Sequence, residues 1–306
     1  MSNVSTAAFY ERSSQSLSSL RARAEALQTA VSSGERLQRS SDDPVAASRL
    51  RSLQRSDGFA AIDTTVAARA STDLTLADSA LSTFASYVTR AQELATQAAS
   101  GTLTQAQRNS IGVEIDQVQQ EMVRLANSRD SAGHALFGGE ATGDAYSIDA
   151  NGIAAYVGTA AATDLPLGDG QTVTRGLTGP EFLNFAVNGN PTNLIAVVKG
   201  LADALQGKVS GTDPAAAAKD ALGALDTGLD TITTAQTVVG ARLNWIDLVD
   251  QRRTAQSELR AQEQADVGGT DIATTITQLQ QAMTVLEASQ ASFTKLASLS
   301  LFDLLR

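Results

Sequence analysis

The C-terminal stretch IATTITQLQQAMTVLEASQASFTKLASLSLFDL, residues 272–304, decides the fold. Its apolar side chains recur with gaps that alternate between three and four residues, which is the spacing of a heptad repeat. The residues that define this repeat most clearly are Ile276, Leu279, Leu286, Phe293 and Leu304. On a helix they form a narrow apolar stripe, wide enough for one partner helix and too narrow for a globular core. The stretch therefore predicts a helix that packs against another helix.

The N-terminal end of the chain carries a matching heptad repeat. Its clearest members are Leu17, Leu20, Leu27 and Val31. Two such helices can pack against each other and complete a monomer, or they can pack against another subunit. Stripes that stay free favour lateral stacking of copies into a ring or a helical assembly. The spacing alone leaves both outcomes open.

A polar run interrupts the first repeat and marks the start of a second helix. Gly34 ends the repeat, and Asp42 or Asp43 is expected to cap a new helix whose first residue is Pro44, where the missing N–H costs nothing. Apolar residues then recur over 74–98 and again over 111–136, which predicts a helical hairpin. We expect the turn between these two helices after Gly101.

The pattern of residue types changes after residue 137. Short β-prone pieces at 145–148, 153–157 and 172–174 alternate with Asn-Gly and Gly-Asp-Gly turns, which predicts a small β-rich insert. Helical patterning returns near residue 193, and a long helix is expected from Ala215 towards Asp266. We place the apolar centre of that helix in seven residues: Val238, Val239, Leu243, Trp245, Ile246, Leu248 and Val249. Asp271 can cap the last helix.

The predicted fold is mainly α. We expect an elongated helical bundle or coiled-coil rod with paired N- and C-terminal helices and a small β-rich inserted domain. The predicted segments are an N-terminal coiled coil (1–40), a first rod segment (41–137), the insert (138–192), a second rod segment (193–267) and a C-terminal coiled coil (268–306).

Composition narrows the function. The chain has 306 residues, 42% of them hydrophobic and only 4% aromatic, which is typical of long helices rather than of a compact enzyme. A net charge of −10 disfavours nucleic acid as a partner, because such a partner requires a clustered basic face. No stretch approaches the ~18 apolar residues of a membrane span, so we expect no membrane insertion. The first residues lack the apolar region of a cleaved signal peptide.

No catalytic constellation is visible in the sequence. His134 is the only histidine and there is no cysteine, so a histidine-based triad or a thiolate metal site cannot be built from one chain. Gly138-Gly139 and 168–170 lack the lysine and the strand-to-helix setting of a phosphate-binding loop. The sequence favours a protein that is not an enzyme and that needs no cofactor or metal ion.

Three blocks resemble one known family. SSGERLQRSSDDPVAASRL (residues 32–50), ELATQAASGTLTQAQRNSIGVEIDQVQQEMVRLANSRDSAGHALFGG (93–139) and the closing KLASLSLFDLLR resemble the shared segments of bacterial flagellins and hook-associated proteins. The Asp42-Asp43-Pro44 ending of the first block is more similar to hook-associated proteins, because flagellins usually follow the two acids with Ala-Ala-Gly-Leu. The second block ends in Leu-Phe-Gly-Gly where flagellins tend to have Phe-Asn-Gly.

The resemblance implies a structural role in the bacterial flagellum. A hook-associated protein of this type is expected to leave the cell unfolded through the flagellar type III apparatus and to assemble outside it. Its implied place is between the first hook-associated protein and flagellin, so both of these and further copies of the chain are expected partners, with an export chaperone as a further candidate. The alternative is a flagellin-type subunit that polymerises into the filament itself.

The resemblance also implies roles for the residues singled out above. The two terminal repeats would form the inner tube of the assembly, where Leu17, Leu20 and their C-terminal counterparts contact neighbouring copies. Asp42, Asp43 and Pro44 would form the turn that links this tube to the rod. The plain alternative for every one of these apolar residues is an ordinary intramolecular core.

Overall fold

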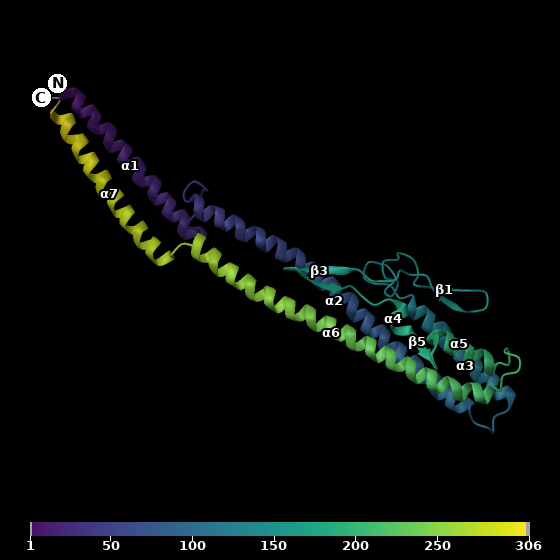
Figure 1. Ribbon diagram of the computed structural model, residues 1–306. Coiled ribbons are helices and arrows are strands. Elements are labelled where there is room, and N and C mark those ends of the chain that lie inside the picture. Colours follow the sequence, from purple (N-terminus) through teal and green to yellow (C-terminus); the bar gives the residue numbers. More distant parts are fainter. Residues whose placement is uncertain (1, 304–306) are drawn as a thin grey trace. The chain divides into compact units, whose positions relative to one another are not determined.

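The computed structural model describes the backbone of residues 2–303 and the side chains of Ala8 and of residues 10–295. Within these residues the chain forms seven helices and three two-stranded antiparallel sheets (Figure 1). The helices are α1 (Ser2–Ser33), α2 (Pro44–Ala98), α3 (Gln105–Ala126), α4 (Gly179–Leu183), α5 (Leu194–Leu205), α6 (Pro214–Gly268) and α7 (Ile272–Asp303). The predicted fold class, mainly α with a small β-rich insert, is confirmed.

The chain forms two compact units. The first consists of residues 1–58 and 255–306, and the second of residues 59–254. The first unit therefore joins both ends of the chain, because α1 and α7 lie side by side in it (Figure 1). The five predicted segments divide the chain more finely, and that division stays a prediction.

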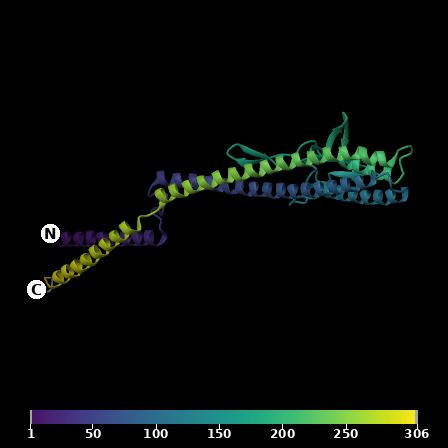
Figure 2. The same cartoon turned by 90° about the horizontal axis from the view of Figure 1, so that it is seen from below.

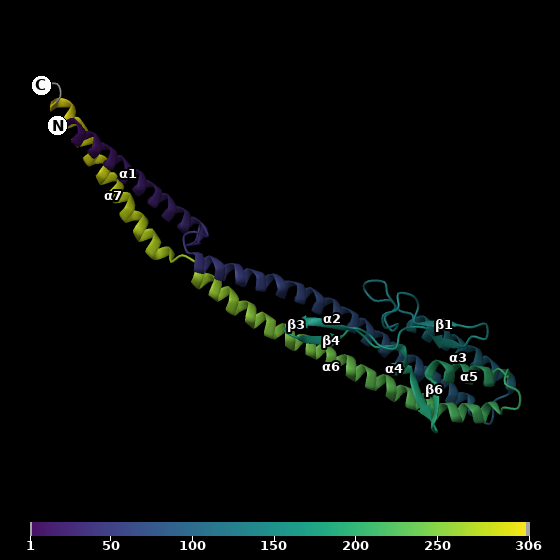
Figure 3. The same ribbon diagram turned by 45° about the horizontal axis from the view of Figure 1, so that its top comes forward.

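The second unit has one contiguous hydrophobic core. Parts of α2 and α6 enclose it together with α3, α4 and α5 (Figure 3). Three buried phenylalanines, Phe84, Phe137 and Phe182, stack with ring centroids 4.8–6.3 Å apart. Helices α3 and α5 approach closely at Gly112, where an added Cβ would lie 3.0 Å from the Cβ of Leu205. Gly112 is therefore required by packing.

Six short strands form three separate hairpins that lie outside the helical core of this unit, drawn in teal in Figure 2. They are β1 (Tyr146–Ile148) with β2 (Ala154–Tyr156), β3 (Asp164–Gly168) with β4 (Gln171–Thr174), and β5 (Asn184–Val187) with β6 (Asn190–Asn193). Each pair is antiparallel and none shares a strand with another. The insert is thus a series of local ribbons.

The β3–β4 hairpin rests on the helices through two contacts. Gly168, with φ +88°, lies so close to α2 that an added Cβ would sit 2.2 Å from a carboxylate oxygen of Asp63. On α6, Arg253 donates from Nη2 to the carbonyl oxygen of Leu167 at 2.5 Å. A residue with a side chain would fit poorly at position 168, because both its backbone angle and its space favour glycine.

Two expectations about these elements are wrong in detail. Helix α3 ends at Ala126, ten residues before the predicted end, because Asn127 caps it and turns its side chain to the insert. Strand β3 was not among the β-prone pieces predicted from the sequence, whereas the predicted Gly-Asp-Gly turn lies where β3 leads into β4. Val238 and Leu248, placed in the apolar centre of α6, are exposed, whereas Val239, Ile246 and Val249 are buried as expected.

Candidate assembly interface

The paired terminal helices bury little of their apolar stripes. Leu17, Leu20, Leu27 and Val31 on α1 are only partly buried, as are Leu279, Leu286 and Phe293 on α7. Among the described side chains of the pair, the buried ones are small or polar: Ala24, Ala30, Thr275 and Ala282. One cross-helix contact is an edge-to-face ring pair between Tyr10 and Phe293, with centroids 5.6 Å apart. The structure thus brings the two predicted stripes together and leaves both partly open.

One edge of α7 is more open still. Ile276 is 39% exposed, and Ile272 and Met283 are also large apolar residues with exposed side chains. A groove of about 630 Å³ lies between α1 and α7, and its walls include Leu17, Leu20, Val285 and Phe293. Leu304, the last predicted member of the stripe, lies outside the described residues.

The predicted turn at Asp42, Asp43 and Pro44 is built from caps. Asp43 accepts a hydrogen bond from the backbone N–H of Ala46 at 3.0 Å and so caps α2, which begins at Pro44. Asp42 accepts from the backbone N–H of Arg39 at 2.9 Å. The bond from Ala46 holds the pKa of the Asp43 carboxyl below its ordinary value. The turn is therefore ordered by its own short-range bonds.

The segment that connects α1 to α2 and the segment that connects α6 to α7 are joined to each other by backbone hydrogen bonds. Glu35 and Gly269 form an isolated antiparallel bridge. Arg36 donates its backbone N–H to Gly268 O at 2.8 Å, and Thr270 donates to Gly34 O at 2.9 Å. Sequence reasoning missed this link, because the partners lie more than 230 residues apart.

In the first unit, α2 and α6 are joined by two sets of ionic bonds. Arg49 binds Glu263 through two hydrogen bonds of 2.5 and 2.8 Å. Asp57 accepts from Arg260 at 2.7 Å and from Gln264 at 2.6 Å. The hydrogen bond from Arg260 lowers the pKa of Asp57 below its ordinary value, and the one from Arg49 does the same for the pKa of Glu263. These contacts fix the antiparallel register of the two helices.

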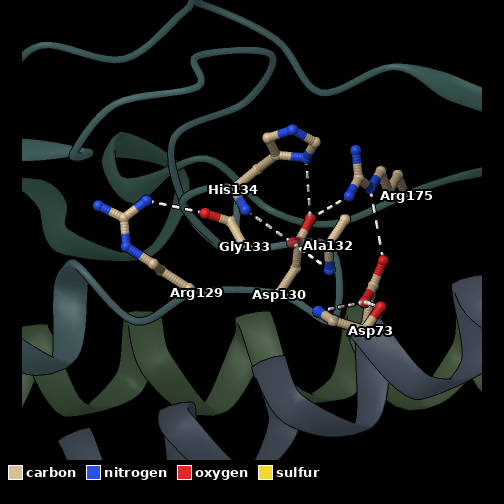
Figure 4. A network of polar contacts seen from close by, with 8 residues as sticks. Asp73, Arg129, Asp130, Ala132, Gly133, His134 and Arg175 are labelled. Atoms are coloured by element: carbon tan, nitrogen blue, oxygen red, sulfur yellow. Dashed lines mark hydrogen bonds and ion pairs between the residues drawn. The ribbon is translucent and has the colours of Figure 1, made fainter.

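The second unit contains a polar network that joins the insert to the helices (Figure 4). Arg175, just after β4, donates from Nε to Asp73 of α2 at 3.4 Å and from Nη2 to Asp130. The Asp73 side chain is 6% exposed and that of Asp130 is 4% exposed. Asp73 also accepts from the hydroxyl of Ser131 at 2.9 Å. One guanidinium therefore offsets the charge of two buried carboxylates, which rigidly connects three segments.

His134, the only histidine, lies at the edge of this network. Its Nδ1 is 3.7 Å from a carboxylate oxygen of Asp130. Its backbone N–H donates to the same aspartate at 2.8 Å. Among the described residues no group of three or more histidine, aspartate or glutamate side chains could hold a metal ion. The network therefore acts to hold the insert, the loop after α3 and helix α2 together.

The described helices include none that is both long enough and apolar enough to cross a membrane. The long helices instead carry frequent polar and charged residues along their exposed faces.

Comparison with known proteins points to one family. Residues 4–142 match the bacterial flagellin N-terminal helical region. The chain is 27% identical over 288 residues to flagellar hook-associated protein 3 of Escherichia coli, and the match covers 90% of each chain. It is also 27% identical over 323 residues to flagellar hook-associated protein 3 of Salmonella typhimurium, with 99% of each chain covered.

A solved structure supports the same fold. The flagellar junction protein FlgL from Legionella pneumophila superposes with a TM-score of 0.58 at 14% sequence identity. The superposition covers 72% of this chain and 99% of that one. At this identity the likeness concerns the fold alone.

Proposed function

The chain belongs to the family of bacterial flagellins and flagellar hook-associated proteins, and from this membership we propose that it joins the hook of a flagellum to the filament. As a member of that family it is a structural component of the flagellum. We further propose that it catalyses no reaction and acts only through assembly.

The observation that carries this proposal is the length of the match with two relatives of one name. Both relatives are flagellar hook-associated proteins 3, and the alignments cover 90% and 99% of this chain. A match restricted to the N-terminal helical region would fit a filament-forming flagellin equally well. The match through the insert and the C-terminal helices therefore favours the junction subunit over a filament subunit.

In this proposal the open stripes of α1 and α7 are the surfaces that contact neighbouring copies. The residues concerned are Leu17, Leu20, Leu27, Val31, Ile276, Leu279, Leu286 and Phe293, and Leu304 is assigned to the same surface from the sequence. Partly exposed leucines at heptad spacing favour a further helix as partner, because such a helix would remove the remaining apolar area from water.

The turn at Asp42, Asp43 and Pro44 has a separate role in the proposal. It sets the direction in which the chain leaves α1 and enters α2. Its capping bonds and the neighbouring backbone bridge between Glu35 and Gly269 support a defined path rather than a loose linker.

The proposed partners are copies of the chain, the first hook-associated protein on the hook side and flagellin on the filament side. We place the assembled protein outside the cell. Export would proceed through the flagellar type III apparatus, and an export chaperone would hold the chain before it leaves the cell.

The position of the protein in the flagellum tests this function directly. In the source bacterium with the gene deleted, we expect hooks without filaments and flagellin released into the medium. Gold-labelled antibody against the restored protein should mark one short zone at the end of the hook. Label along the whole filament would instead support the filament subunit and refute the junction role.

A matched pair of substitutions tests the proposed surface. Leu20→Glu places a charge in the stripe of α1, whereas Ser19→Glu adds the same charge at an exposed neighbouring position. Leu20→Glu should leave the chain secreted and missing from the flagellum, while Ser19→Glu should assemble. Equal assembly of both variants would contradict the role of this stripe.

A further inference from the structure

The first unit carries unpaired charges on the faces of α2 and α6 that point away from their ionic bonds. Arg51 and Arg55 on α2 and Glu258 on α6 are exposed, and none has a hydrogen-bond or ion-pair partner among the described residues. Asp266 on α6 is also exposed, and only Gln262 of its own helix donates to it. One helix thus presents two free cations, and the other presents two anions without a cationic partner.

The same faces contain an apolar residue and a place for it. Leu259 is 72% exposed, among the most exposed large apolar residues described. Ser52 on α2 is exposed and small and lies about 60° around the helix from Arg55, so the backbone of α2 can be approached closely there. A single exposed leucine is ordinary on a protein surface, but here it lies beside the unpaired Glu258.

We propose that these faces bind each other between copies, so that Arg51 and Arg55 of one copy pair with Asp266 and Glu258 of the next. This inference rests on the proposed function, which brings copies of the chain side by side. The contact is heterologous, since one copy offers α2 and the other offers α6. Contacts of this kind continue from copy to copy and close into a ring or extend as a helix.

The spacing along the two helices supports one register for the contact. In an antiparallel pair, residues at the same level have position numbers with a constant sum. Arg51 with Asp266 gives a sum of 317, and Arg55 with Glu258 gives a sum of 313. Both pairs therefore fall within two residues, or about 3 Å, of a register with the sum 315.

Leu259 fits this register as well. At a sum of 315 it lies level with position 56 of the neighbouring copy, about one helical turn from Ser52. Within one copy, Asp57 and Arg260 also give a sum of 317, and Arg49 with Glu263 gives 312. Because the two registers nearly coincide, adjacent copies would have their α2 and α6 segments at nearly the same height.

Because the chain contains no cysteine, only cysteines that are introduced by mutation can form a disulfide. Two single-cysteine variants, Arg51→Cys and Asp266→Cys, are produced together in a strain without its own gene, and the flagella are isolated and oxidised. The expected result is a covalent dimer that forms only when both variants are present. Arg55→Cys with Glu258→Cys should give the same dimer.

A register control uses the same residues in another combination. Arg51→Cys with Glu258→Cys has a sum of 309, which offsets the two cysteines by about 9 Å, too far for a disulfide. This pair should give at least about tenfold less dimer. If it reacts as well as the matched pairs, or if the matched pairs do not react, the contact is overturned.

A charge exchange tests the energetics of the contact. The variant Arg51→Glu with Arg55→Glu opposes like charges across the contact, and so does Glu258→Arg with Asp266→Arg. Each should lower the amount of the protein in isolated flagella by about tenfold, and combining all four changes should restore it. If the variant with all four changes is no more abundant in isolated flagella than the two double variants, the proposal is overturned.

The outcome for the unmodified chain separates this inference from the proposed function. If the unmodified chain is absent from isolated flagella, the proposed function is wrong and the contact falls with it. If the chain is present while the matched cysteine pairs stay monomeric, the contact alone is wrong.

Discussion

Removal of the Arg175 guanidinium should destabilise the second unit far more than removal of an exposed arginine. The change Arg175→Met keeps much of the side-chain volume and leaves Asp73 and Asp130 without their shared cation. Loss of one partner from a buried ion pair costs about 3–5 kcal/mol. Arg175 itself is 32% exposed, so we expect the lower end, about 3 kcal/mol.

The assay is thermal unfolding followed by circular dichroism, with urea unfolding as a second measurement. For a unit of roughly 200 residues, a change of about 3 kcal/mol lowers the midpoint by about 6–12 °C. The matched control is Arg129→Met, which removes the 2.8 Å bonds to the exposed Asp144 and to Gly133 O and should cost under about 1 kcal/mol. Adding Asp73→Asn to Arg175→Met should recover part of the loss, because it removes one of the unpaired charges.

Two results would refute this reasoning. If Arg175→Met cost no more than Arg129→Met, the buried carboxylates would not depend on the guanidinium. If Asp73→Asn made the Arg175→Met variant less stable still, the residual charge would not be the source of the loss.

Three further changes have definite expected outcomes. Asp43→Ala removes the cap of α2 and should lower the thermal midpoint by about 2–4 °C, whereas Asp43→Ser should retain most of it. The pKa of Asp57 is lowered by Arg260, so its contribution is present above about pH 4 and is lost as the pH falls through the lowered pKa. Asp57→Asn should therefore reduce stability in urea at pH 7 and have little effect near pH 2, and an equal loss at both would contradict the assignment. Gly168→Ala should lower stability in urea unfolding more than Gly170→Ala does, because both glycines have positive φ but only Gly168 contacts α2. Equal losses of stability would show that the contact with α2 is not the cause.

The helices could be predicted from the sequence because their signals are local. Pro44 after two acids marks the start of α2, and Asp271 caps α7 by accepting the backbone N–H groups of Ala273 and Thr274. Each signal lies within four residues of the element it defines, so no tertiary information is needed.

The end of α3 could not be predicted in the same way. The heptad-like spacing continues past Ala126 to Leu136, yet Asn127 there takes both the N–H and the C=O of Tyr146. Leu136 is buried all the same, in the common core rather than on a helix face. A spacing pattern reports which residues are buried, and it does not report whether a helix or a loop buries them.

The contact between the insert and the helices could not be predicted from the sequence either. Asp73 and Arg175 are separated by 102 positions, and nothing in the local pattern of either residue indicates a partner. The candidate interface was easier to predict from the sequence, because α1 and α7 each carry a regular apolar stripe. Their mutual packing was one of the two outcomes that the spacing allowed, and the structure shows it together with the openness that the second outcome requires.

The pairing of α1 with α7 also determines when the first helix can fold. Ser33 ends α1 and Ile272 begins its partner, so about 240 residues must be added to the growing chain before the two can meet. At a synthesis rate of about 5–20 residues per second this takes roughly 10–50 s. A helix with a narrow apolar stripe is marginal on its own in water, so α1 spends this interval as an unpaired segment open to other binding partners. Helix α1 is made well before its partner and is thus among the last elements to fold.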